Sequence, residues 1–500
     1  PRPDRMVRDS STNAKRGGTR VPPRFAFRDP PFGADCHEPS TEWGITVKDL
    51  WAHSANELAA LIAARQVSSR EVIDAHLERI EEVNPALNAI VRVLADDARA
   101  GADAADRAVA AGERLGPLHG VPFTVKENID LAGTPTTQAI AVLAEAIADR
   151  DAPVVEHMRA AGAIPIGRTN LPDLGLRVHT DSQLHGLTRN PWDPNRTAGG
   201  SSGGEGSALA SGMSPIGLGN DIGGSLRNPA HCCGIASIKP TTGVVPHATV
   251  VPPVDWGISQ QMMLVEGVMA RRPADVRTGL LAVAGVSTRD PLSVPARLID
   301  LAPGQRLRVG LLPTPPGGST HPGIADVVRR AGAVLAGLGH TVEEATPPGY
   351  ERVVELWLRL LVADLSVQRE LLEMVMGEDG RTFARFGIEL GGTVTHTELL
   401  LELAERQGHQ RAWAGWFEQY DVLVCPVWTQ PPFTHGFDIA SLDTARAVIE
   451  LIRPVVTANY LGIPAAVAPV GMADGLPVGV QIVGPAFSDL RCLAVAEQLD

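Results

Sequence analysis

Cysteine is scarce in this sequence. The 500 residues contain five cysteines, and no two of them have the Cys-x-x-Cys spacing that is typical of a zinc site or a redox pair. An odd and sparse set also excludes a disulfide scaffold, which needs many paired cysteines. We therefore expect a protein of a reducing compartment, the cytoplasm. The cysteines are Cys36, Cys232, Cys233, Cys425 and Cys492.

Aromatic residues and positive charge are also in short supply. Phe, Trp and Tyr make up 4% of the chain, and the formal net charge is −13 at pH 7. Few aromatic rings are left for stacking on bases, and an acidic protein repels phosphate backbones. The composition therefore predicts no nucleic-acid partner.

Long apolar runs are missing too. A helix that spans a membrane needs about 18 or more apolar residues. The two longest candidates are Leu461–Val470, which contains Pro464 and Pro469, and Leu356–Leu365, which contains Arg359. Both runs are too short and too interrupted, so we expect no membrane span.

Motifs that bind metals, phosphates or dinucleotides do not occur. The 14 histidines form no His-Glu-x-x-His pair, and no glycine-rich segment continues into Gly-Lys-Ser or Gly-Lys-Thr. Gly217-Leu-Gly219 lacks the spacing of a dinucleotide-binding fingerprint. We therefore expect neither a metal nor a cofactor.

The composition changes near residue 42. Residues 1–42 are rich in Arg, Pro and Gly without helical or strand periodicity, and we expect a disordered or misassigned leader. From Trp43 onward helical and strand patterns alternate, which predicts an α/β architecture. Ser54 and Ser68 each precede a Glu by three residues, the capping box that begins a helix. Asn84-Pro85 is expected to end the second of these helices.

Two clusters of glycine and serine are the most unusual feature of the chain. They are Gly199-Gly-Ser-Ser-Gly-Gly204 and Asp221-Ile-Gly-Gly-Ser-Leu-Arg227, in a stretch, 198–242, that we expect to form loops around a site. A glycine-rich backbone can direct several N–H groups at one point, and such groups stabilise an oxyanion while a nearby serine attacks a carbonyl. Ordinary loops are equally rich in glycine, so the clusters alone decide nothing.

Lys126 offers the base that a serine nucleophile needs. It directly follows the apolar segment Val121–Val125, which is expected to form a buried strand. Burial disfavours the ammonium form, so a lysine in this position can be neutral near pH 7 and accept a proton. Glu127 should point to the opposite face of the strand. Most lysines at strand ends are solvated charges, however, and Lys126 alone is weak evidence.

Together these segments resemble the amidase signature family. The likeness rests on Gly199-Gly-Ser-Ser-Gly-Gly204, Gly219-Asn-Asp-Ile-Gly-Gly-Ser-Leu-Arg-Asn-Pro-Ala230, Gly234-Ile-Ala-Ser-Ile-Lys-Pro-Thr241 and Gly120-Val-Pro-Phe-Thr-Val-Lys126-Glu-Asn128. It implies an α/β fold with a large mixed β-sheet covered by helices on both faces. A single domain would then extend over 43–500, with a signature core at 120–241 and a variable substrate-pocket region at about 313–418.

The resemblance also implies a Ser–cis-Ser–Lys triad. Ser225 would be the acyl nucleophile, and Ser201 would follow a cis peptide bond and relay the proton to Lys126, a neutral general base. The backbone N–H groups of Ile222, Gly223, Gly224 and Ser225 itself would form the oxyanion hole. Supporting roles would fall to Gly200, Ser202, Asp221 and Arg227, with Ser202 as a hydrogen-bonding neighbour. No metal or cofactor takes part in this chemistry.

Two segments depart from the family pattern. Asn220 stands where Thr is usual, which could alter a hydrogen bond behind the triad. The family commonly has a Gly-Ser pair after Thr136-Thr137, whereas this chain has Gln138-Ala-Ile-Ala. The second segment shapes the substrate pocket in the family, so the substrate of any one relative is not carried over.

Two other functions compete with this hypothesis. Gly199-Gly-Ser201-Ser-Gly203 matches the Gly-x-Ser-x-Gly turn of an α/β-hydrolase esterase with Ser201 as nucleophile, but the preceding Asn195–Ala198 is polar where that turn requires an apolar strand. The chain could also be the glutamine-hydrolysing component of a tRNA-dependent transamidation complex. The net negative charge and Ile222, where such components usually have Thr, are evidence against it.

The expected substrate is a small molecule with an amide bond, an aryl amide and a carbamate being among the candidates, and ester cleavage a conceivable side activity. Trp357, Leu358, Leu361, Trp416 and the turn at Val427-Trp428 suggest apolar pocket walls, although a packed helical core explains them equally well. Dimers are common in the family, so a homodimer is one expected state.

Overall fold

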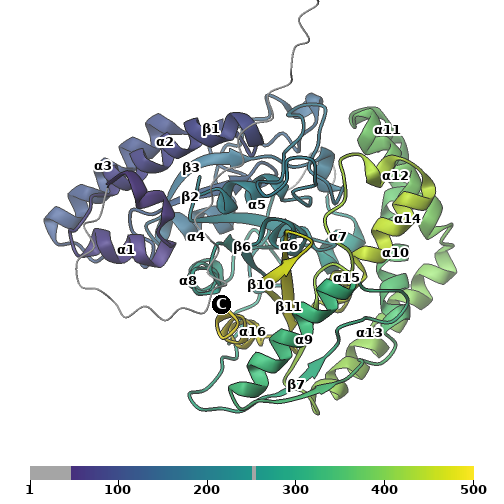
Figure 1. Ribbon diagram of the computed structural model, residues 1–500. Coiled ribbons are helices and arrows are strands. Elements are labelled where there is room, and N and C mark those ends of the chain that lie inside the picture. The colour runs from purple at the N-terminus through teal and green to yellow at the C-terminus, as the bar shows by residue number, and fades with distance from the viewer. Residues whose placement is uncertain (1–46, 250–254) are drawn as a thin grey trace, which may run out of the picture. The chain divides into compact units, whose positions relative to one another are not determined.

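The apolar segments of the chain assemble one mixed β-sheet of 11 strands in the order β1-β3-β2-β4-β6-β5-β10-β11-β9-β7-β8. Figure 1 shows this sheet among the helices that cover it. The computed structural model describes residues 47–249 and 255–500. The strands are β1 (Ile90–Val93), β2 (Pro122–Lys126), β3 (Ile164–Thr169), β4 (Ile216–Asp221), β5 (Ala236–Lys239), β6 (Val265–Ala270), β7 (Arg308–Leu311), β8 (Thr341–Glu344), β9 (Val422–Pro426), β10 (Ala465–Ala473) and β11 (Leu476–Val483).

Helices cover both faces of this sheet, so the predicted fold class is confirmed. The α-helices are α1 (Ala55–Ala63), α2 (Ser69–Leu87), α3 (Ala95–Ala111), α4 (Pro153–Ala160), α5 (Gly203–Ala210), α6 (Arg227–Cys233), α7 (Ile258–Met263), α8 (Pro273–Val283), α9 (Pro322–Gly337), α10 (Tyr350–Val367), α11 (Arg369–Val375), α12 (Glu378–Gly391), α13 (His396–Phe417), α14 (Leu442–Leu451), α15 (Arg453–Leu461) and α16 (Asp489–Glu497). Short 3-10 helices are η1 (Val47–Ala52), η2 (Ala141–Leu143), η3 (Asp173–Gly175) and η4 (Phe437–Ile439). Across the described ranges, no helix is both long and apolar enough to cross a membrane.

The side chains of β10 point alternately to the two faces of the sheet and so contribute to two separate layers of hydrophobic core. Ala466 and Ala468 belong to one hydrophobic cluster with side chains of α8, α9 and α16, whereas Ala465 and Val467 belong to another with side chains of α6 and α15. Successive residues of a strand point to opposite faces, so the two sets of helices lie on opposite sides of the sheet. Both strand faces are buried, which explains why β10 is apolar at nearly every position.

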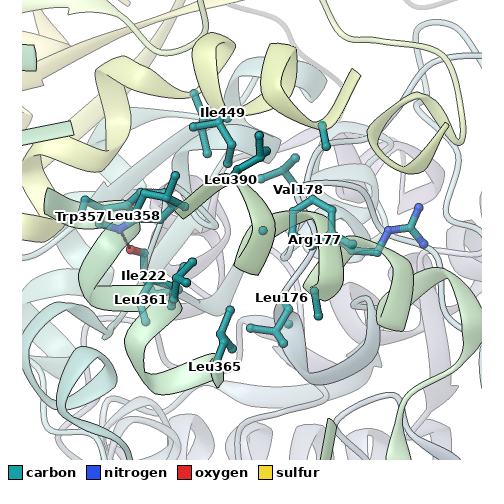
Figure 2. A pocket seen from close by; sticks show the side chains of 18 of the residues that line it. Leu176, Arg177, Val178, Ile222, Trp357, Leu358, Leu361, Leu365, Leu390 and Ile449 are labelled. Carbon is teal, nitrogen blue, oxygen red and sulfur yellow. Dashed lines mark hydrogen bonds between the residues drawn. The ribbon is translucent and has the colours of Figure 1, made fainter. Parts of the chain in front are cut away.

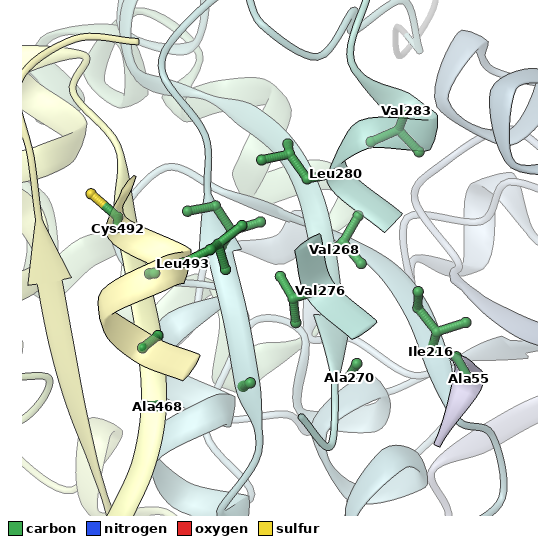
Figure 3. Close-up of a cluster of buried hydrophobic side chains, with 14 of the residues drawn as sticks. Ala55, Ile216, Val268, Ala270, Val276, Leu280, Val283, Ala468, Cys492 and Leu493 are labelled. Carbon is green, nitrogen blue, oxygen red and sulfur yellow. The ribbon is translucent and has the colours of Figure 1, made fainter. Parts of the chain in front are cut away.

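The first of these layers is built almost entirely from aliphatic side chains. Figure 3 shows Val276 and Leu280 of α8 next to Val268 of β6, with Leu493 of α16 beside them. All four are buried. A chain with few aromatic residues fills its core with branched aliphatic groups, because these interdigitate well between a helix and a sheet.

Three neighbouring parallel strands, β3, β2 and β4, position the candidate site. β2 is parallel to both β3 and β4, with Val125 of β2 opposite Leu218 of β4. Parallel neighbours have their carboxyl ends at the same edge. Lys126, the last residue of β2, and Asp221, the last residue of β4, therefore lie at one edge of the sheet.

Both predicted capping boxes are present. Ser54 and Ser68 each accept a hydrogen bond from the backbone of the Glu three residues later, and α1 and α2 begin directly after them. The predicted end of α2 at Asn84-Pro85 is wrong, because the helix continues to Leu87. Proline in the last turn costs few helical hydrogen bonds, and Asn84 Oδ1 accepts the N–H groups of Ala89 and Ile90, each at 2.9 Å.

The interpretation of 198–242 as loops is also wrong. This stretch contains α5, β4, α6 and β5, and almost all of it is buried. Its glycines allow close packing: a Cβ at Gly204 would lie 2.7 Å from the carbonyl oxygen of Ala89, and one at Gly206 would lie 2.8 Å from Pro229 Cβ. The predicted leader, 1–42, lies outside the described residues, and Trp43–Asp500 make up one compact unit.

Candidate active site

Lys126 and Ser201 are in direct contact beneath the surface. Lys126 Nζ donates hydrogen bonds to Ser201 Oγ at 2.8 Å and to Asn220 Oδ1 at 2.6 Å. Asn220 in turn donates from Nδ2 to Asn128 Oδ1 at 2.9 Å, so the amide of Asn220 is held in one orientation. Lys126 is completely buried and Ser201 is nearly so. Asn220, which stands where the family usually has Thr, thus accepts a hydrogen bond directly from the lysine.

Ser201 is placed by an unusual backbone segment. The Gly200–Ser201 peptide bond is cis, the conformation implied by the family resemblance. A Cβ at Gly200 would lie 2.5 Å from the carbonyl carbon of Val178, so only glycine fits there. The segment ends at Ser202, and α5 begins at the next residue, Gly203.

Burial controls the protonation of Lys126. Removal from water lowers the pKa of Lys126 to about 7, against the opposing influence of the carboxyl groups of Asp221, Glu205 and Glu266. Glu127 is not among these groups, since its carboxylate contacts Thr137 and His185 instead. The neutral amine that a general base requires is thus available near neutral pH.

Ser225 lies between β4 and α6 and is 6% exposed. It lines a cavity of about 370 Å³ that is also lined by Ser201, Asn128 and Asn220. Within the described part of the chain, no hydrogen bond joins the hydroxyl groups of Ser201 and Ser225. Lys126 and Ser201 are therefore joined by a hydrogen bond, and Ser225 lines the same cavity without a hydrogen bond to Ser201.

The turn before Ser225 is held by hydrogen bonds to the side chain of Asp221. Gly224 donates its N–H to Asp221 Oδ1 at 2.7 Å, and Leu226 donates its N–H to Asp221 Oδ2 at 3.2 Å. The Gly224 N–H group, one of the four predicted oxyanion donors, is therefore already bound to a carboxylate in this structure. The N–H groups of Ile222, Gly223 and Ser225 have no acceptor among the described residues, and they are the remaining candidate donors.

Trp357 of α10 fixes the peptide that joins Ile222 to Gly223. Its Nε1 donates to the carbonyl oxygen of Ile222 at 2.8 Å. A trans peptide holds its C=O and N–H in opposite directions, so this contact turns the Gly223 N–H away from Trp357. Asn228 Nδ2 donates to the carbonyl oxygen of Gly223 at 3.1 Å and restrains the next peptide.

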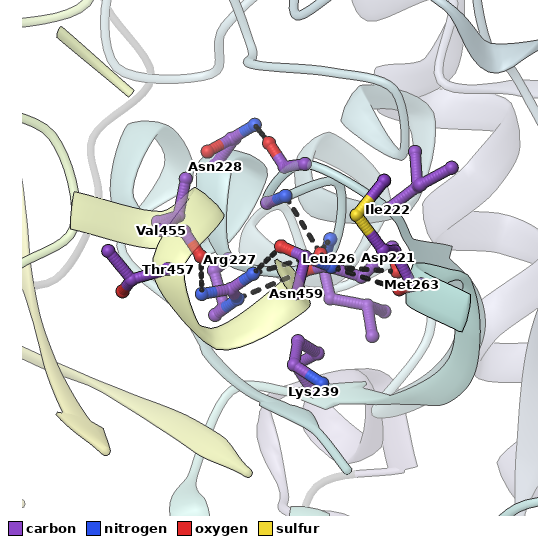
Figure 4. A network of polar contacts seen from close by, with 12 residues as sticks. Asp221, Ile222, Leu226, Arg227, Asn228, Lys239, Met263, Val455, Thr457 and Asn459 are labelled. Carbon is purple, nitrogen blue, oxygen red and sulfur yellow. Dashed lines mark hydrogen bonds and ion pairs between the residues drawn. The ribbon is translucent and has the colours of Figure 1, made fainter. Parts of the chain in front are cut away.

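A buried ion pair anchors the same turn (Figure 4). Arg227 donates to both carboxylate oxygens of Asp221, from Nη2 at 2.9 Å and from Nε at 3.0 Å. Asn459 Nδ2 also donates to Asp221 Oδ1, at 2.8 Å. Burial alone would raise the pKa of Asp221, but Arg227 and Asn459 outweigh it and lower the pKa to about 2. Asp221 therefore stays ionised and continues to accept the backbone N–H groups of Gly224 and Leu226.

A narrow apolar pocket, drawn in Figure 2, shares lining residues with this cavity. Its volume is about 60 Å³, and Ile222 and Ser225 line both spaces. Arg177 also lines the narrow pocket, but its Nε donates to the buried Asp438 at 2.9 Å. The other side chains at its wall include Leu176, Val178, Trp357, Leu358, Leu361, Leu365, Phe383 and Ile449.

Comparison with known proteins identifies the family. The family model described as Amidase matches residues 71–493. The chain belongs to the amidase signature family. It is 38% identical over 453 residues to an indoleacetamide hydrolase of Bradyrhizobium diazoefficiens, covering 90% of this chain and 86% of the relative. It is 33% identical to a glutamyl-tRNA(Gln) amidotransferase subunit of Acidothermus cellulolyticus, covering 91% and 95% of the two chains.

A solved structure of the same fold agrees. The structure of 6-aminohexanoate cyclic dimer hydrolase in complex with substrate superimposes with a TM-score of 0.78 at 30% identity, over 90% of this chain and 97% of that one. The reaction class of this amidase is therefore the hydrolysis of amide C–N bonds. In the described ranges, no group of three or more His, Cys, Asp or Glu side chains could hold a metal ion.

The amidase geometry excludes Ser201 as an α/β-hydrolase nucleophile. No strand leads into Ser201, and the contact that its hydroxyl makes is with Lys126. Ser202 was expected to form hydrogen bonds near the site. Its buried Oγ instead has no partner among the described residues and faces Gly219, where a Cβ would lie 2.9 Å away.

Some of the apolar residues predicted at the pocket do line it, but two carboxyl groups near Lys126 were not predicted. Trp357, Leu358 and Leu361 line the narrow pocket, whereas Trp416 and Trp428 belong to the hydrophobic core. Glu205 of α5 and Glu266 of β6 influence Lys126 from distant parts of the sequence. The only hint of them in the sequence was an acidic residue within an otherwise small or apolar segment.

The Asp221–Arg227 pair leads to a stability prediction. Arg227→Met removes the cation and leaves a buried carboxylate, so we expect the free energy of unfolding to fall by about 3–5 kcal/mol. Chemical denaturation followed by circular dichroism would measure the change. Arg352→Met is the matched control, because the Arg352–Glu405 pair is substantially exposed and should lose less than about 1 kcal/mol. Equal losses in the two variants would contradict the anchoring role of Arg227.

Proposed function

We propose that this amidase cleaves amides through a Ser225 acyl-enzyme, with Ser201 as proton relay and Lys126 as neutral general base. The observation that carries the proposal is the buried 2.8 Å contact between Lys126 Nζ and Ser201 Oγ in a cavity that Ser225 also lines. A base of lowered pKa within hydrogen-bond reach of a hydroxyl is the arrangement that activates a serine.

The steps follow from this arrangement. Ser225 Oγ attacks the amide carbonyl carbon, its proton passes to Ser201, and the Ser201 proton passes to the Lys126 amine. The N–H groups of Ile222, Gly223 and Ser225 stabilise the oxyanion of the tetrahedral intermediate. Collapse of the intermediate breaks the C–N bond, and the proton returns through Ser201 to the leaving nitrogen. Water then attacks the acyl ester by the same route and releases the acid.

The proposed substrates are amides that carry an aryl or other apolar group of modest size. The narrow pocket beside Ser225 is lined mainly by aliphatic and aromatic side chains, with Ile222 at its entrance. The named activity of the indoleacetamide hydrolase, which is 38% identical, also involves an aromatic amide. Aryl carbamates have the same shape around the carbonyl and form a second group to be tested.

A substrate panel tests this preference. Burial of a phenyl-sized group contributes about 1.5–3 kcal/mol, so kcat/KM for phenylacetamide should exceed that for acetamide or glutamine by about 10- to 100-fold. The panel should include indole-3-acetamide, an anilide, an aryl carbamate, malonamide and glutamine. Ile222→Thr is the matched variant, and it should narrow the gap between phenylacetamide and glutamine.

Glutamine is the informative competitor, because the chain is also similar to a glutamyl-tRNA(Gln) amidotransferase subunit. If glutamine or malonamide outranks every aromatic substrate, the proposed apolar specificity is wrong. The acyl-enzyme mechanism would survive that outcome, since it depends on Lys126, Ser201 and Ser225 alone.

A further inference from the structure

A second pair of titratable side chains lies next to the triad. His247 Nδ1 and Glu266 Oε1 are 2.9 Å apart. His247 lines the same cavity as Ser201 and Ser225, and its side chain is 15% exposed. Glu266 lies on β6 and is completely buried. The mechanism proposed above gives neither residue a task.

The Glu266 carboxylate depends on His247 for compensation. Its second oxygen, Oε2, is buried without a hydrogen-bond partner among the described residues. A buried carboxylate is stable only when it is paired or neutralised. In the part of the chain that the structure describes, His247 is the group that forms an ion pair with Glu266.

Glu266 is also a neighbour of the catalytic lysine. In the sheet, Glu266 of β6 is directly opposite Asn220 of β4, and Asn220 accepts a hydrogen bond from Lys126 Nζ. The Glu266 carboxylate attracts the ammonium form of Lys126 and raises its pKa. A negative charge on Glu266 therefore works against the neutral base.

The other two carboxyl groups near Lys126 are compensated in different ways. Asp221 is paired with Arg227, a permanent cation. Glu205 accepts hydrogen bonds from Thr124 and Thr169, and burial raises the pKa of Glu205 to about 7. Of the three, Glu266 is the one whose partner is titratable and lines the substrate cavity.

We propose that His247 is a positioning residue that, as an imidazolium, neutralises Glu266 and thereby keeps Lys126 in its uncharged form. The inference rests on the proposed function, in which Lys126 is the general base. It adds a residue that acts on the base through a neighbouring carboxylate and touches none of the reacting atoms.

The surroundings of His247 favour its protonated form. Burial lowers the pKa of His247, but the negative charges of Glu266, Asp290 and Asp130 outweigh this and the pKa is raised. Asp290 also accepts the backbone N–H of His247 at 2.9 Å, and Asp255 lines the same cavity. Arg289, which lines a neighbouring cavity together with His247, is bound to Glu156 and to the carbonyl oxygen of Asp151.

The sign of each substitution follows. His247→Gln removes a positive charge and leaves Glu266 uncompensated, so Lys126 should hold its proton to higher pH. Glu266→Gln removes the negative charge, so Lys126 should lose its proton at lower pH. In the double variant the histidine position has no carboxylate to neutralise, and Lys126 should titrate as in Glu266→Gln.

Lysine-selective 13C NMR can measure this directly, because the chain has only four lysines: Lys15, Lys48, Lys126 and Lys239. The full-length protein would be titrated with 13C at Cε, and the signal lost in Lys126→Arg assigns Lys126. We expect the midpoint to rise by about one pH unit in His247→Gln and to fall by a similar amount in Glu266→Gln. The pH profile for fluorophosphonate labelling of Ser225 should shift in the same directions.

His340→Gln is the matched control. His340 is another buried histidine, hydrogen bonded to Gln498 and to the backbone of Leu307, and it should leave the Lys126 midpoint unchanged. An unchanged or lower midpoint in His247→Gln would overturn the inference, as would additive shifts in the double variant. Failure of the proposed function would look different, because Lys126→Arg would then retain labelling and turnover whatever the NMR midpoints.

Discussion

Ser225→Ala is expected to lower kcat by about 10⁴-fold or more and to abolish covalent labelling by a fluorophosphonate. The hydroxyl of Ser225 is the atom that forms the acyl bond, and without it only substrate binding and the oxyanion donors can act on the amide. Active-site titration followed by mass spectrometry of the labelled peptide would measure both effects.

Substitutions of two further serines serve as a comparison and a control for this experiment. Ser201→Ala should reduce kcat by about 10²–10⁴-fold, because it removes a proton relay but leaves the nucleophile. Ser237→Ala should leave labelling intact, since Ser237 is a buried serine of β5 whose hydroxyl has no hydrogen-bond partner among the described residues. An adduct on Ser201 or Ser202 in the wild-type protein would show that Ser225 is not the nucleophile.

Lys126→Arg is expected to lower kcat by about 10³-fold or more, although arginine is also a long basic side chain. An arginine side chain does not release its proton in this pH range, so it cannot accept one from Ser201. In the wild-type protein, burial lowers the pKa of Lys126 to about 7, and only the deprotonated amine is a base. Activity should therefore rise as pH increases through about 7 and level off above it.

Steady-state kinetics from pH 5 to pH 9 would measure this profile in the wild-type and variant proteins. Lys239→Met is the matched control, because Lys239 is equally buried but donates to the carbonyl oxygen of Pro240. It should retain the rise in activity near pH 7. Substantial activity in Lys126→Arg, or a wild-type protein that is inactivated by chelators and restored by zinc, would contradict the proposed base.

Local sequence patterns predicted the elements that depend on local chemistry. The helices after Ser54 and Ser68 begin where their capping boxes place them, because a cap is formed by residues three positions apart. Lys126 lies at the end of a buried strand because the apolar segment before it can only be an interior strand. The family resemblance supplied the mixed character of the sheet, which strand patterns alone do not specify.

The errors share one physical cause. Glycine at Gly204 and Gly206 was interpreted as a sign of loops, whereas it allows a helix to pack closely against a neighbouring backbone. The same limit applies to Glu205 and Glu266, which approach Lys126 only through the pairing of strands and helices. The sequence also does not show that the N–H of Gly224, a predicted oxyanion donor, is bound to the Asp221 carboxylate. Tertiary packing decides each of these cases.

The hydrogen bond from Trp357 to Ile222 ties specificity to catalytic rate. Trp357 lines the narrow apolar pocket proposed to bind the substrate, and its indole also orients a peptide of the turn before Ser225. Gly223 fits under the same ring, where a Cβ would lie 2.6 Å from Trp357 Cζ2. Redesign of the pocket for new substrates could change Leu358 or Leu361 without removing this hydrogen bond, whereas Trp357 and Gly223 would have to be changed together. During evolution of new substrate preferences, substitutions at Trp357 and Gly223 would be constrained in the same way.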